Sequence, residues 1–329
     1  MRTHAVCAVA PDRVIFGEVT VPDPGPTEVL VHTAHSSIST GTERWVITGQ
    51  FHPPGQPPTP HPLVPGYQKV GTVEAFGDQV RGLSLGQWVF ATTSRISDGA
   101  TSAWGGHIEH SVCDQREIIP LPDGLDPVKA SALVLTQVGY NGGSRPHVKR
   151  GDAALVVGDG LVGQWLAQML RHRGARVVLV GRRPERLALA KEHSADLTVN
   201  EREASLESVK ADAAPEGFDI VADTVGTAKS AEKIVALVRR NGHLILNGYY
   251  REGEHMMSIQ SLHAREATVH SPAGWSRERL LATLELVEQG VLKVRELTTH
   301  VIPARDAHRA YDLVLRKTEP FLGICLQWR

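Results

Sequence analysis

The feature that most constrains the fold is the segment GDGLVG at positions 158–163, which stands between an apolar run and a helical pattern. Ala153–Val157, directly ahead of it, is continuously apolar, as a strand buried on both faces requires. Val162–Arg171 shows helical periodicity. In this strand–turn–helix context the G-x-G-x-x-G pattern indicates the dinucleotide-binding turn of a Rossmann fold. A plain glycine-rich turn is the alternative.

Each glycine of this motif has an expected task. Gly158 permits the tight turn after the strand, and Gly160 lets the backbone approach a pyrophosphate. Gly163 lets the following helix pack closely against the strand. The free N–H groups at the start of that helix then favour the phosphate charge.

The end of the second strand indicates which dinucleotide binds. An NAD site usually carries an acid there, roughly 20 residues beyond the glycine motif, to hold the ribose 2′-hydroxyl. This chain has Gly181-Arg182-Arg183 instead, and a guanidinium group suits a phosphate. We therefore predict NADP(H). The alternative is that both arginines only solvate the start of the next helix. The expected cofactor contacts are Gly158, Gly160, Leu161, Val162, Gly163, Gly181, Arg182, Arg183, Thr224, Gly248 and Tyr249.

The organisation of the chain changes near Asp126. Residues before it read as short strands separated by glycine and proline, whereas strands and helices alternate after it. We expect helices at Pro184–Glu192 and Ser230–Arg239, and strands at Arg176–Val180, Phe218–Ala222 and His243–Leu246. The pattern predicts an α/β protein, with short strands and turns in the first part of the chain and a doubly wound parallel sheet from about Asp126 onward.

Composition excludes several classes of function. The net charge is −1, so nucleic acid and membrane surfaces are not expected partners. No apolar run is long enough to span a bilayer, and the N-terminus has no signal-like apolar region. Three scattered cysteines, Cys7, Cys113 and Cys325, argue against a disulfide framework and fit the reducing cytoplasm.

Two sets of motifs carry a resemblance to a known family. Gly105–Glu109 with Leu121–Leu125, and Leu297–His300 with Ala307, Ala310 and Tyr311, resemble the medium-chain dehydrogenase/reductase superfamily. The resemblance implies a mostly-β, GroES-like catalytic domain built from both chain ends, at 1–125 and 291–329, and a Rossmann domain inserted at 126–290. It also implies an active-site cleft at their junction and, in many members, a homodimer formed through the Rossmann sheet.

A closer resemblance is to the bacteriochlorophyllide a dehydrogenase-like subfamily. It rests on Ile38–Glu43, Pro62–Tyr67, Gly248–Tyr250 and Cys325–Arg329. The chain departs from that subfamily at Gly181-Arg182-Arg183 and at Gln68, where acids are expected.

Zinc-dependent members of the superfamily carry Cys-Gly-x-Asp and Gly-His-Glu. At the matching places this chain has Thr40-Gly41-Thr42-Glu43 and Gly66-Tyr67-Gln68, and the remaining ligand position falls near Leu133. A catalytic zinc needs about three protein ligands, and a structural lobe needs four cysteines. We therefore expect no metal. The pair His107-x-x-His110 lies on an extended segment, where residues three apart point to opposite faces.

Without zinc, another group must stabilise charge on the substrate oxygen. By position the resemblance assigns this task to Tyr67, with Thr42 and Gln68 orienting the carbonyl. The alternative is that Tyr67 is a packing residue whose hydroxyl makes a structural hydrogen bond, and His52 and His61 are second candidates for the acid.

Three functions therefore remain open. The first is an NADPH-dependent reductase of a ketone or of a C=C bond conjugated to a carbonyl. The second is a secondary-alcohol dehydrogenase of the bacteriochlorophyllide type, and the third is a non-catalytic dinucleotide-binding protein. For either enzyme the expected partner is a small-molecule carbonyl or alcohol, and the fold alone does not decide.

Overall fold

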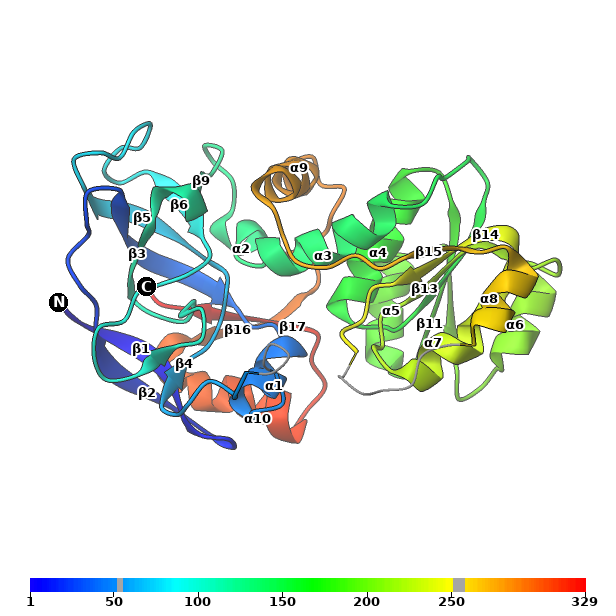
Figure 1. Cartoon of the computed structure of the whole chain (residues 1–329), viewed down its shortest axis with the longest axis horizontal. Helices are drawn as coiled ribbons and strands as arrows, with labels where there is room; N and C mark the ends of the chain where they lie inside the picture. Colours follow the sequence, from blue (N-terminus) through cyan, green and yellow to red (C-terminus); the bar gives the residue numbers. More distant parts are fainter. Residues whose placement is uncertain (52–55, 251–257) are drawn as a thin grey trace. The chain divides into compact units, whose positions relative to one another are not determined.

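The computed structural model describes residues 1–51, 56–250 and 258–329 and divides into two compact units. Unit 1 comprises Met1–Val134 and Val294–Arg329, and unit 2 comprises Leu135–Lys293 (Figure 1). The sequence predicts boundaries at 125/126 and 290/291. At the first boundary, unit 1 extends beyond residue 125 to Val134, because helix α2 (Pro127–Ala130) packs against its strands. At the second boundary, residues 291–293 belong to unit 2.

Unit 1 is built mainly from strands in two sheets. One sheet has the order β2-β1-β4-β7; the other has the order β16-β17-β3-β5-β6-β9, and β8 pairs with β3. The strands are β1 (Arg2–Ala10), β2 (Arg13–Thr20), β3 (Glu28–Ser37), β4 (Leu63–Val64), β5 (Lys69–Phe76), β6 (Trp88–Ala91), β7 (Thr101–Ser102), β8 (His110–Asp114), β9 (Ile118–Pro120), β16 (Thr298–Pro303) and β17 (Gly323–Gln327). Its other helices are α1 (Thr42–Ile47) and α10 (Ala307–Arg316).

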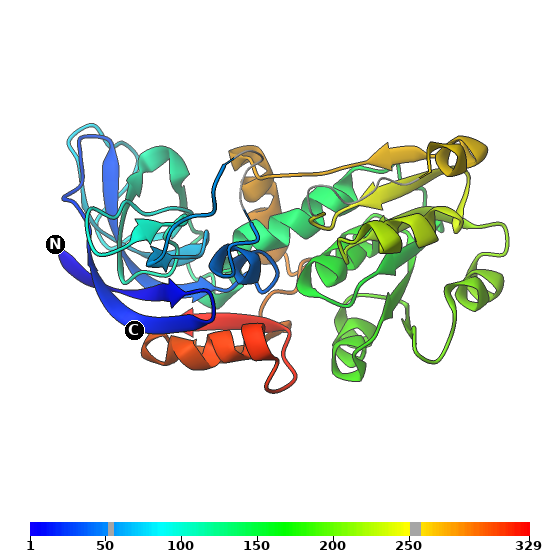
Figure 2. The same cartoon turned by 60° about the horizontal axis from the view of Figure 1, so that its bottom comes forward.

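The two ends of the chain meet in the larger sheet of unit 1. Strand β17 runs antiparallel to β3, with Cys325 opposite Ser37. Helix α10 packs against β2 and β17 (Figure 2). Its apolar face, including the fully buried Tyr311, completes a core with Ile38 and Leu326. The C-terminal segment therefore supports the part of unit 1 that carries Thr42 and Tyr67.

Unit 2 is a six-stranded sheet in which every neighbouring pair is parallel. The order β12-β11-β10-β13-β14-β15 is the 3-2-1-4-5-6 order of a Rossmann fold. The strands are β10 (Ala153–Val157), β11 (Arg176–Gly181), β12 (Leu197–Asn200), β13 (Phe218–Asp223), β14 (Val238–Leu246) and β15 (Thr268–His270). The predicted α/β class is confirmed.

Helices cover both faces of this sheet (Figure 1). Side chains of α4 and α5 pack on one face, and those of α6, α7 and α8 pack on the other. The helices of unit 2 are α3 (Leu133–Ser144), α4 (Leu161–His172), α5 (Pro184–His193), α6 (Leu206–Ala213), α7 (Ala228–Val235), α8 (Ile259–Arg265) and α9 (Arg277–Glu288), with the first two residues of α3 counted in unit 1.

One predicted helix is too long. The sequence predicts helix over Ser230–Arg239, but α7 ends at Val235 and β14 begins at Val238. The Leu237 carbonyl accepts the N–H of Phe218 at 2.8 Å, so sheet pairing overrides the helical period there.

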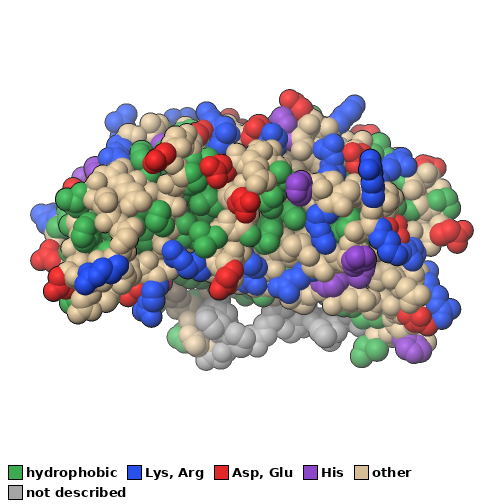
Figure 3. Space-filling view, turned by 90° about the horizontal axis from the view of Figure 1, so that it is seen from above, with side chains coloured by type: hydrophobic (Ala, Val, Ile, Leu, Met, Phe, Trp, Pro, Cys, Tyr) green, Lys and Arg blue, Asp and Glu red, His purple; other side chains and the backbone are tan. Residues whose placement is uncertain are grey.

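The distribution of charge on the surface and the hydropathy of the helices are consistent with the composition. Figure 3 shows basic and acidic side chains interspersed over the face it presents. Among the described residues, no helix is long and apolar enough to cross a bilayer.

Candidate active site

Two of the three motif glycines are required by their close neighbours. Gly158 follows β10 with φ of 122°, and a Cβ there would lie 2.3 Å from the Thr224 hydroxyl oxygen. A Cβ on Gly163 would lie 2.1 Å from the Gly158 carbonyl oxygen. The Thr224 hydroxyl itself donates to the Val157 carbonyl at 3.0 Å. The turn therefore tolerates no side chain at either position.

The third glycine faces open space. Gly160 is the N-cap residue of α4, and no atom lies within 4 Å of the Cβ it lacks. The first N–H groups of α4 begin here, with Leu161 buried and Val162 half-buried. An open cradle of backbone donors at a helix N-terminus fits a pyrophosphate. The residues present therefore fit a dinucleotide.

The loops after β13 and β14 close on the same edge of the sheet. A Cβ on Gly248 would lie 2.3 Å from the Cα of Gly226. The buried Asp223 carboxylate holds both loops, because it accepts the Gly226 N–H at 3.0 Å and the Tyr250 hydroxyl at 2.6 Å. Tyr249 is exposed beside them. The structure thus brings Thr224 to Gly158 and places Gly248 against the loop that follows Thr224. Asp223 and Tyr250 were not predicted, because their pairing depends on tertiary contact.

A carboxylate lies at the end of β11, although the sequence at that point has no acid. The Asp159 carboxylate, from the middle of the glycine motif, accepts the backbone N–H groups of Arg182 at 2.7 Å and Arg183 at 3.0 Å. A Cβ on Gly181 would lie 2.5 Å from it, so only glycine fits there. Arg186 lies 3.6 Å away across an ion pair. The only sign of this contact in the sequence is the acid itself, in the second position of the G-x-G-x-x-G motif.

Arginine side chains surround this corner. Arg182 pairs with Glu201 and is mostly exposed, whereas Arg183 is half-buried. Arg186 is largely buried, and burial lowers its pKa from the usual value. Three guanidinium groups and three carboxylates, those of Asp159, Glu201 and Glu185, share the end of β11.

In unit 1, Tyr67 lies in a buried polar cluster. Its side chain is 4% exposed and hydrogen-bonds with the hydroxyl groups of Ser39 and Thr42. Burial raises the pKa of the phenol well above its usual value, so it stays protonated. Trp104 packs edge-on against the ring at 5.5 Å. Thr42, at the start of α1, is half-buried.

Glu43 organises the base of this cluster. The fully buried carboxylate accepts the Ser39 N–H at 2.7 Å and the Tyr311 hydroxyl at 2.5 Å. It also pairs with Nε2 of His107 at 2.9 Å, and Nδ1 of His107 lies 2.8 Å from the Ser36 hydroxyl. Two segments far apart in sequence, at His107 and Tyr311, therefore hold the α1 turn that presents Thr42.

The remaining candidates have different surroundings. The Gln68 amide is fully buried and donates to the Ser37 carbonyl at 3.1 Å. Nε2 of His61 lies 3.0 Å from the Ile47 carbonyl oxygen, and His52 lies outside the described residues. His107 and His110 share no partner: His107 contacts Glu43, whereas His110 contacts Thr3.

The residues at the superfamily's zinc positions do not fit that metal. A hydroxyl, a phenol, an amide and an alkyl group occupy them, in Thr40, Tyr67, Gln68 and Leu133. Zinc takes thiolate, imidazole or carboxylate ligands. The three cysteines are buried and unbridged, and burial raises the pKa of each thiol to about 11.

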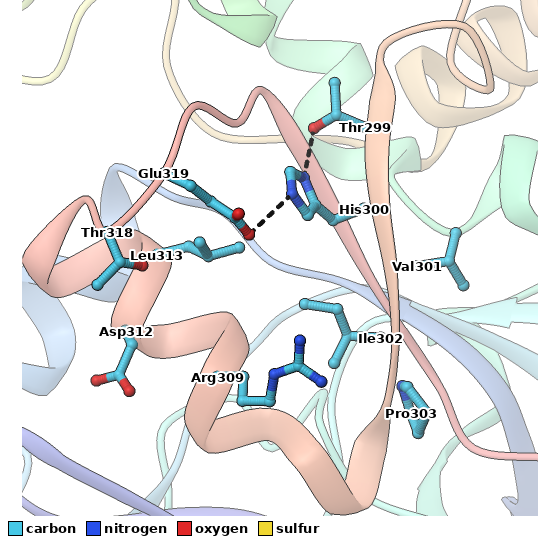
Figure 4. Close-up of a pocket in the computed structure, with 10 residues that line it drawn as sticks. All are labelled: Thr299, His300, Val301, Ile302, Pro303, Arg309, Asp312, Leu313, Thr318 and Glu319. Atoms are coloured by element: carbon cyan, nitrogen blue, oxygen red, sulfur yellow. Dashed lines mark hydrogen bonds and ion pairs between the residues drawn. The ribbon is translucent and has the colours of Figure 1, made fainter.

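A separate pocket of about 430 Å³ lies in unit 1 between β16 and α10 (Figure 4). Nδ1 of His300 lies 2.8 Å from the Thr299 hydroxyl, and Nε2 lies 3.5 Å from Glu319. None of the predicted site residues lines it. The lining residues are Thr299, His300, Val301, Ile302, Pro303, Arg309, Asp312, Leu313, Thr318 and Glu319.

Known families match both units. The alcohol dehydrogenase GroES-like domain matches residues 25–123, and the zinc-binding dehydrogenase family matches residues 162–289. The chain belongs to the medium-chain dehydrogenase/reductase superfamily. It is accordingly an oxidoreductase that uses a nicotinamide dinucleotide and acts on a small molecule.

Individual members of this superfamily match along the whole chain. The 2-desacetyl-2-hydroxyethyl bacteriochlorophyllide A dehydrogenase of Cereibacter sphaeroides is 27% identical, over 100% of this chain and 99% of the relative, in line with the subfamily resemblance. Two solved structures share the fold. A putative zinc-binding dehydrogenase from Sinorhizobium meliloti bound to NADP has a TM-score of 0.86 at 21% identity, covering 100% of both chains. An alcohol dehydrogenase from Escherichia coli bound to NADH has a TM-score of 0.86 at 18% identity, covering 99% of both chains.

Proposed function

We propose that this oxidoreductase uses NADP(H), needs no zinc for catalysis, and reduces a ketone or a C=C bond conjugated to a carbonyl. The observation that carries the proposal is the buried, protonated Tyr67 in the place of the superfamily's zinc-binding histidine. A neutral phenol can donate a hydrogen bond to an oxygen on which negative charge develops.

The residues around Tyr67 have complementary tasks in this proposal. A bound nicotinamide would supply the hydride for the substrate carbon. Tyr67 donates its hydrogen bond to the substrate oxygen, while the Ser39 and Thr42 hydroxyls hold the phenol oxygen. Gln68 fixes the start of β5 through the Ser37 carbonyl and thereby orients the neighbouring Tyr67. Each group is positioned before the charge forms, which is the condition for electrostatic stabilisation.

The guanidinium groups at the end of β11 support NADP(H). Arg182, Arg183 and Arg186 surround the place where a 2′-phosphate binds in Rossmann folds. Asp159 fixes the backbone of this corner through the two arginine N–H groups, and its own charge faces Arg186. A guanidinium–phosphate hydrogen bond contributes about 1.5–3 kcal/mol.

A second candidate is the oxidation of a secondary alcohol on a large pigment. The full-length match to the bacteriochlorophyllide dehydrogenase favours it. The same residues serve both directions, because a group that stabilises the transition state does so for the forward and the reverse reaction.

We also propose that the enzyme is a cytoplasmic homodimer. Strand β15 is the edge of the six-stranded sheet, and Val269 on it is 39% exposed. Pairing of two such edges would cover the unpaired backbone groups. Sedimentation of the purified protein tests the dimer, and a monomer at micromolar concentration contradicts it.

The activity is tested by following nicotinamide absorbance in two assays. In the first, NADPH is mixed with a panel of enones and ketones; in the second, NADP⁺ is mixed with secondary alcohols, including a hydroxyethyl-bearing tetrapyrrole. Turnover of an enone or ketone supports the proposal. Turnover confined to the tetrapyrrole alcohol supports the second candidate.

A further inference from the structure

Three side chains from three neighbouring strands of the larger sheet of unit 1 converge, and none of them belongs to the Tyr67 cluster. They are His32 on β3, Glu74 on β5 and His110 on β8, and we refer to them as the three-strand cluster. Their nearest ligand atoms all lie within 4.8 Å of one another. Three adjacent strands thus each contribute one potential metal ligand.

Strand register brings these residues together. His32 lies directly opposite His110 on the neighbouring antiparallel strand, and their rings stack at 4.5 Å. The register between β3 and β5 shifts next to Glu74, which falls between the paired residues Val73 and Ala75. Such irregularities re-aim a side chain. Oε2 of Glu74 lies 3.4 Å from Nε2 of His110.

A second contact orients the His110 ring. Its Nδ1 lies 3.0 Å from the Thr3 hydroxyl oxygen, which also accepts the His110 backbone N–H at 3.1 Å. Nε2 of His110 is therefore the nitrogen that faces Glu74. A partner on the second ring nitrogen is the usual support of a metal-binding histidine.

The local charges favour a cation. Glu74 is joined by Glu109, whose carboxylate lies 3.9 Å from Nδ1 of His110. Arg329 is the opposing charge: its guanidinium donates to the Thr72 hydroxyl at 2.9 Å and lies over the Trp88 ring. Two carboxylates against one guanidinium leave the cluster negative. The Glu74 side chain is 46% exposed, so an ion can enter from solvent.

We propose that the three-strand cluster binds one divalent zinc ion, with His32, Glu74 and His110 as ligands and water in the fourth position. Two imidazoles and a carboxylate are a donor set that suits zinc. Around a tetrahedral zinc, neighbouring donors lie about 3.4 Å apart. The pair between Glu74 and His110 already has this separation, and rotation of the His32 ring completes the set. The ion links β3, β5 and β8, so its binding should raise the free energy of unfolding.

The site is independent of the proposed reduction, because none of its residues belongs to the Tyr67 cluster. The test is a calorimetric titration of zinc chloride into the chelator-treated, full-length protein. We expect one zinc per chain and a rise in Tm on binding. His110→Asn and Glu74→Gln should each weaken binding by at least about tenfold and reduce the Tm rise measured at the same zinc concentration.

The control variant is His308→Asn, which removes an exposed histidine of α10 and should bind zinc like the wild type. Glu74→Gln changes a half-exposed side chain, so the test remains valid if His110→Asn folds poorly. Absence of binding to the wild type overturns the proposal. Undiminished binding in both ligand variants also overturns it.

Discussion

Replacement of Tyr67 by phenylalanine isolates the proposed hydrogen bond to the substrate oxygen. The ring stays in place against Trp104, and only the hydroxyl held by Ser39 and Thr42 is removed. A donor aimed at developing charge in a buried site contributes about 2.7–4 kcal/mol, or about a hundred- to a thousandfold in rate. The single-turnover rate of NADPH oxidation with a saturating ketone or enone is therefore expected to fall by at least about thirtyfold.

The stability of the same variant should hardly change. Loss of a neutral hydrogen bond costs about 1 kcal/mol in the free energy of unfolding. Tyr311→Phe is the matched control, because it also removes a buried phenol, here one bonded to the Glu43 carboxylate. We expect it to lower Tm more and the rate less than Tyr67→Phe does. The reasoning is refuted if Tyr67→Phe keeps the wild-type rate and loses Tm, since Tyr67 is then only a packing residue.

Three further results are expected. NADP(H) should bind at least about tenfold more tightly than NAD(H) in calorimetric titrations, and the double variant Arg182→Ala, Arg183→Ala should remove this difference. Equal affinities of the wild type for the two nucleotides would contradict the NADP(H) assignment. Asp159→Asn keeps an acceptor for the backbone N–H groups of Arg182 and Arg183 but removes a negative charge beside the 2′-phosphate. The affinity for NADPH should therefore rise by about fivefold. A fall in affinity would show that the carboxylate helps to hold the nucleotide. Burial raises the pKa of Tyr67, so the phenol keeps its proton above pH 10. The single-turnover rate should therefore show no decline with an apparent pKa near 10. Such a decline in the wild type, absent in Tyr67→Phe, would contradict the buried phenol.

The sequence predicted those parts of the site that depend on local signals. The apolar run Ala153–Val157 and the glycines after it define β10, the turn and α4 within a residue or two, because strand burial and close helix packing leave a direct mark on composition. Family resemblance predicted the two-part organisation. The predicted helix Ser230–Arg239 fails in its last residues because sheet pairing, which is non-local, decides that stretch.

Side-chain partnerships between distant segments were beyond sequence reasoning. Glu43 and Tyr311 are 268 residues apart, yet their hydrogen bond holds the α1 turn. Asp159 stands at a variable position of the glycine motif, yet its carboxylate lies at the end of the second strand, where the sequence itself has no acid. Neither contact follows from periodicity or spacing. Both require the fold to bring the side chains together.

The claim that the reaction needs no zinc is tested most directly by hydride transfer in a protein freed of metal. Because the three-strand cluster is expected to hold zinc, the experiment uses chelator-treated Glu74→Gln protein, with metal content measured by elemental analysis. We predict no stoichiometric zinc and a single-turnover rate of NADPH oxidation equal to that of the untreated wild type. A rate that is lost on chelation and restored by added zinc would contradict the account.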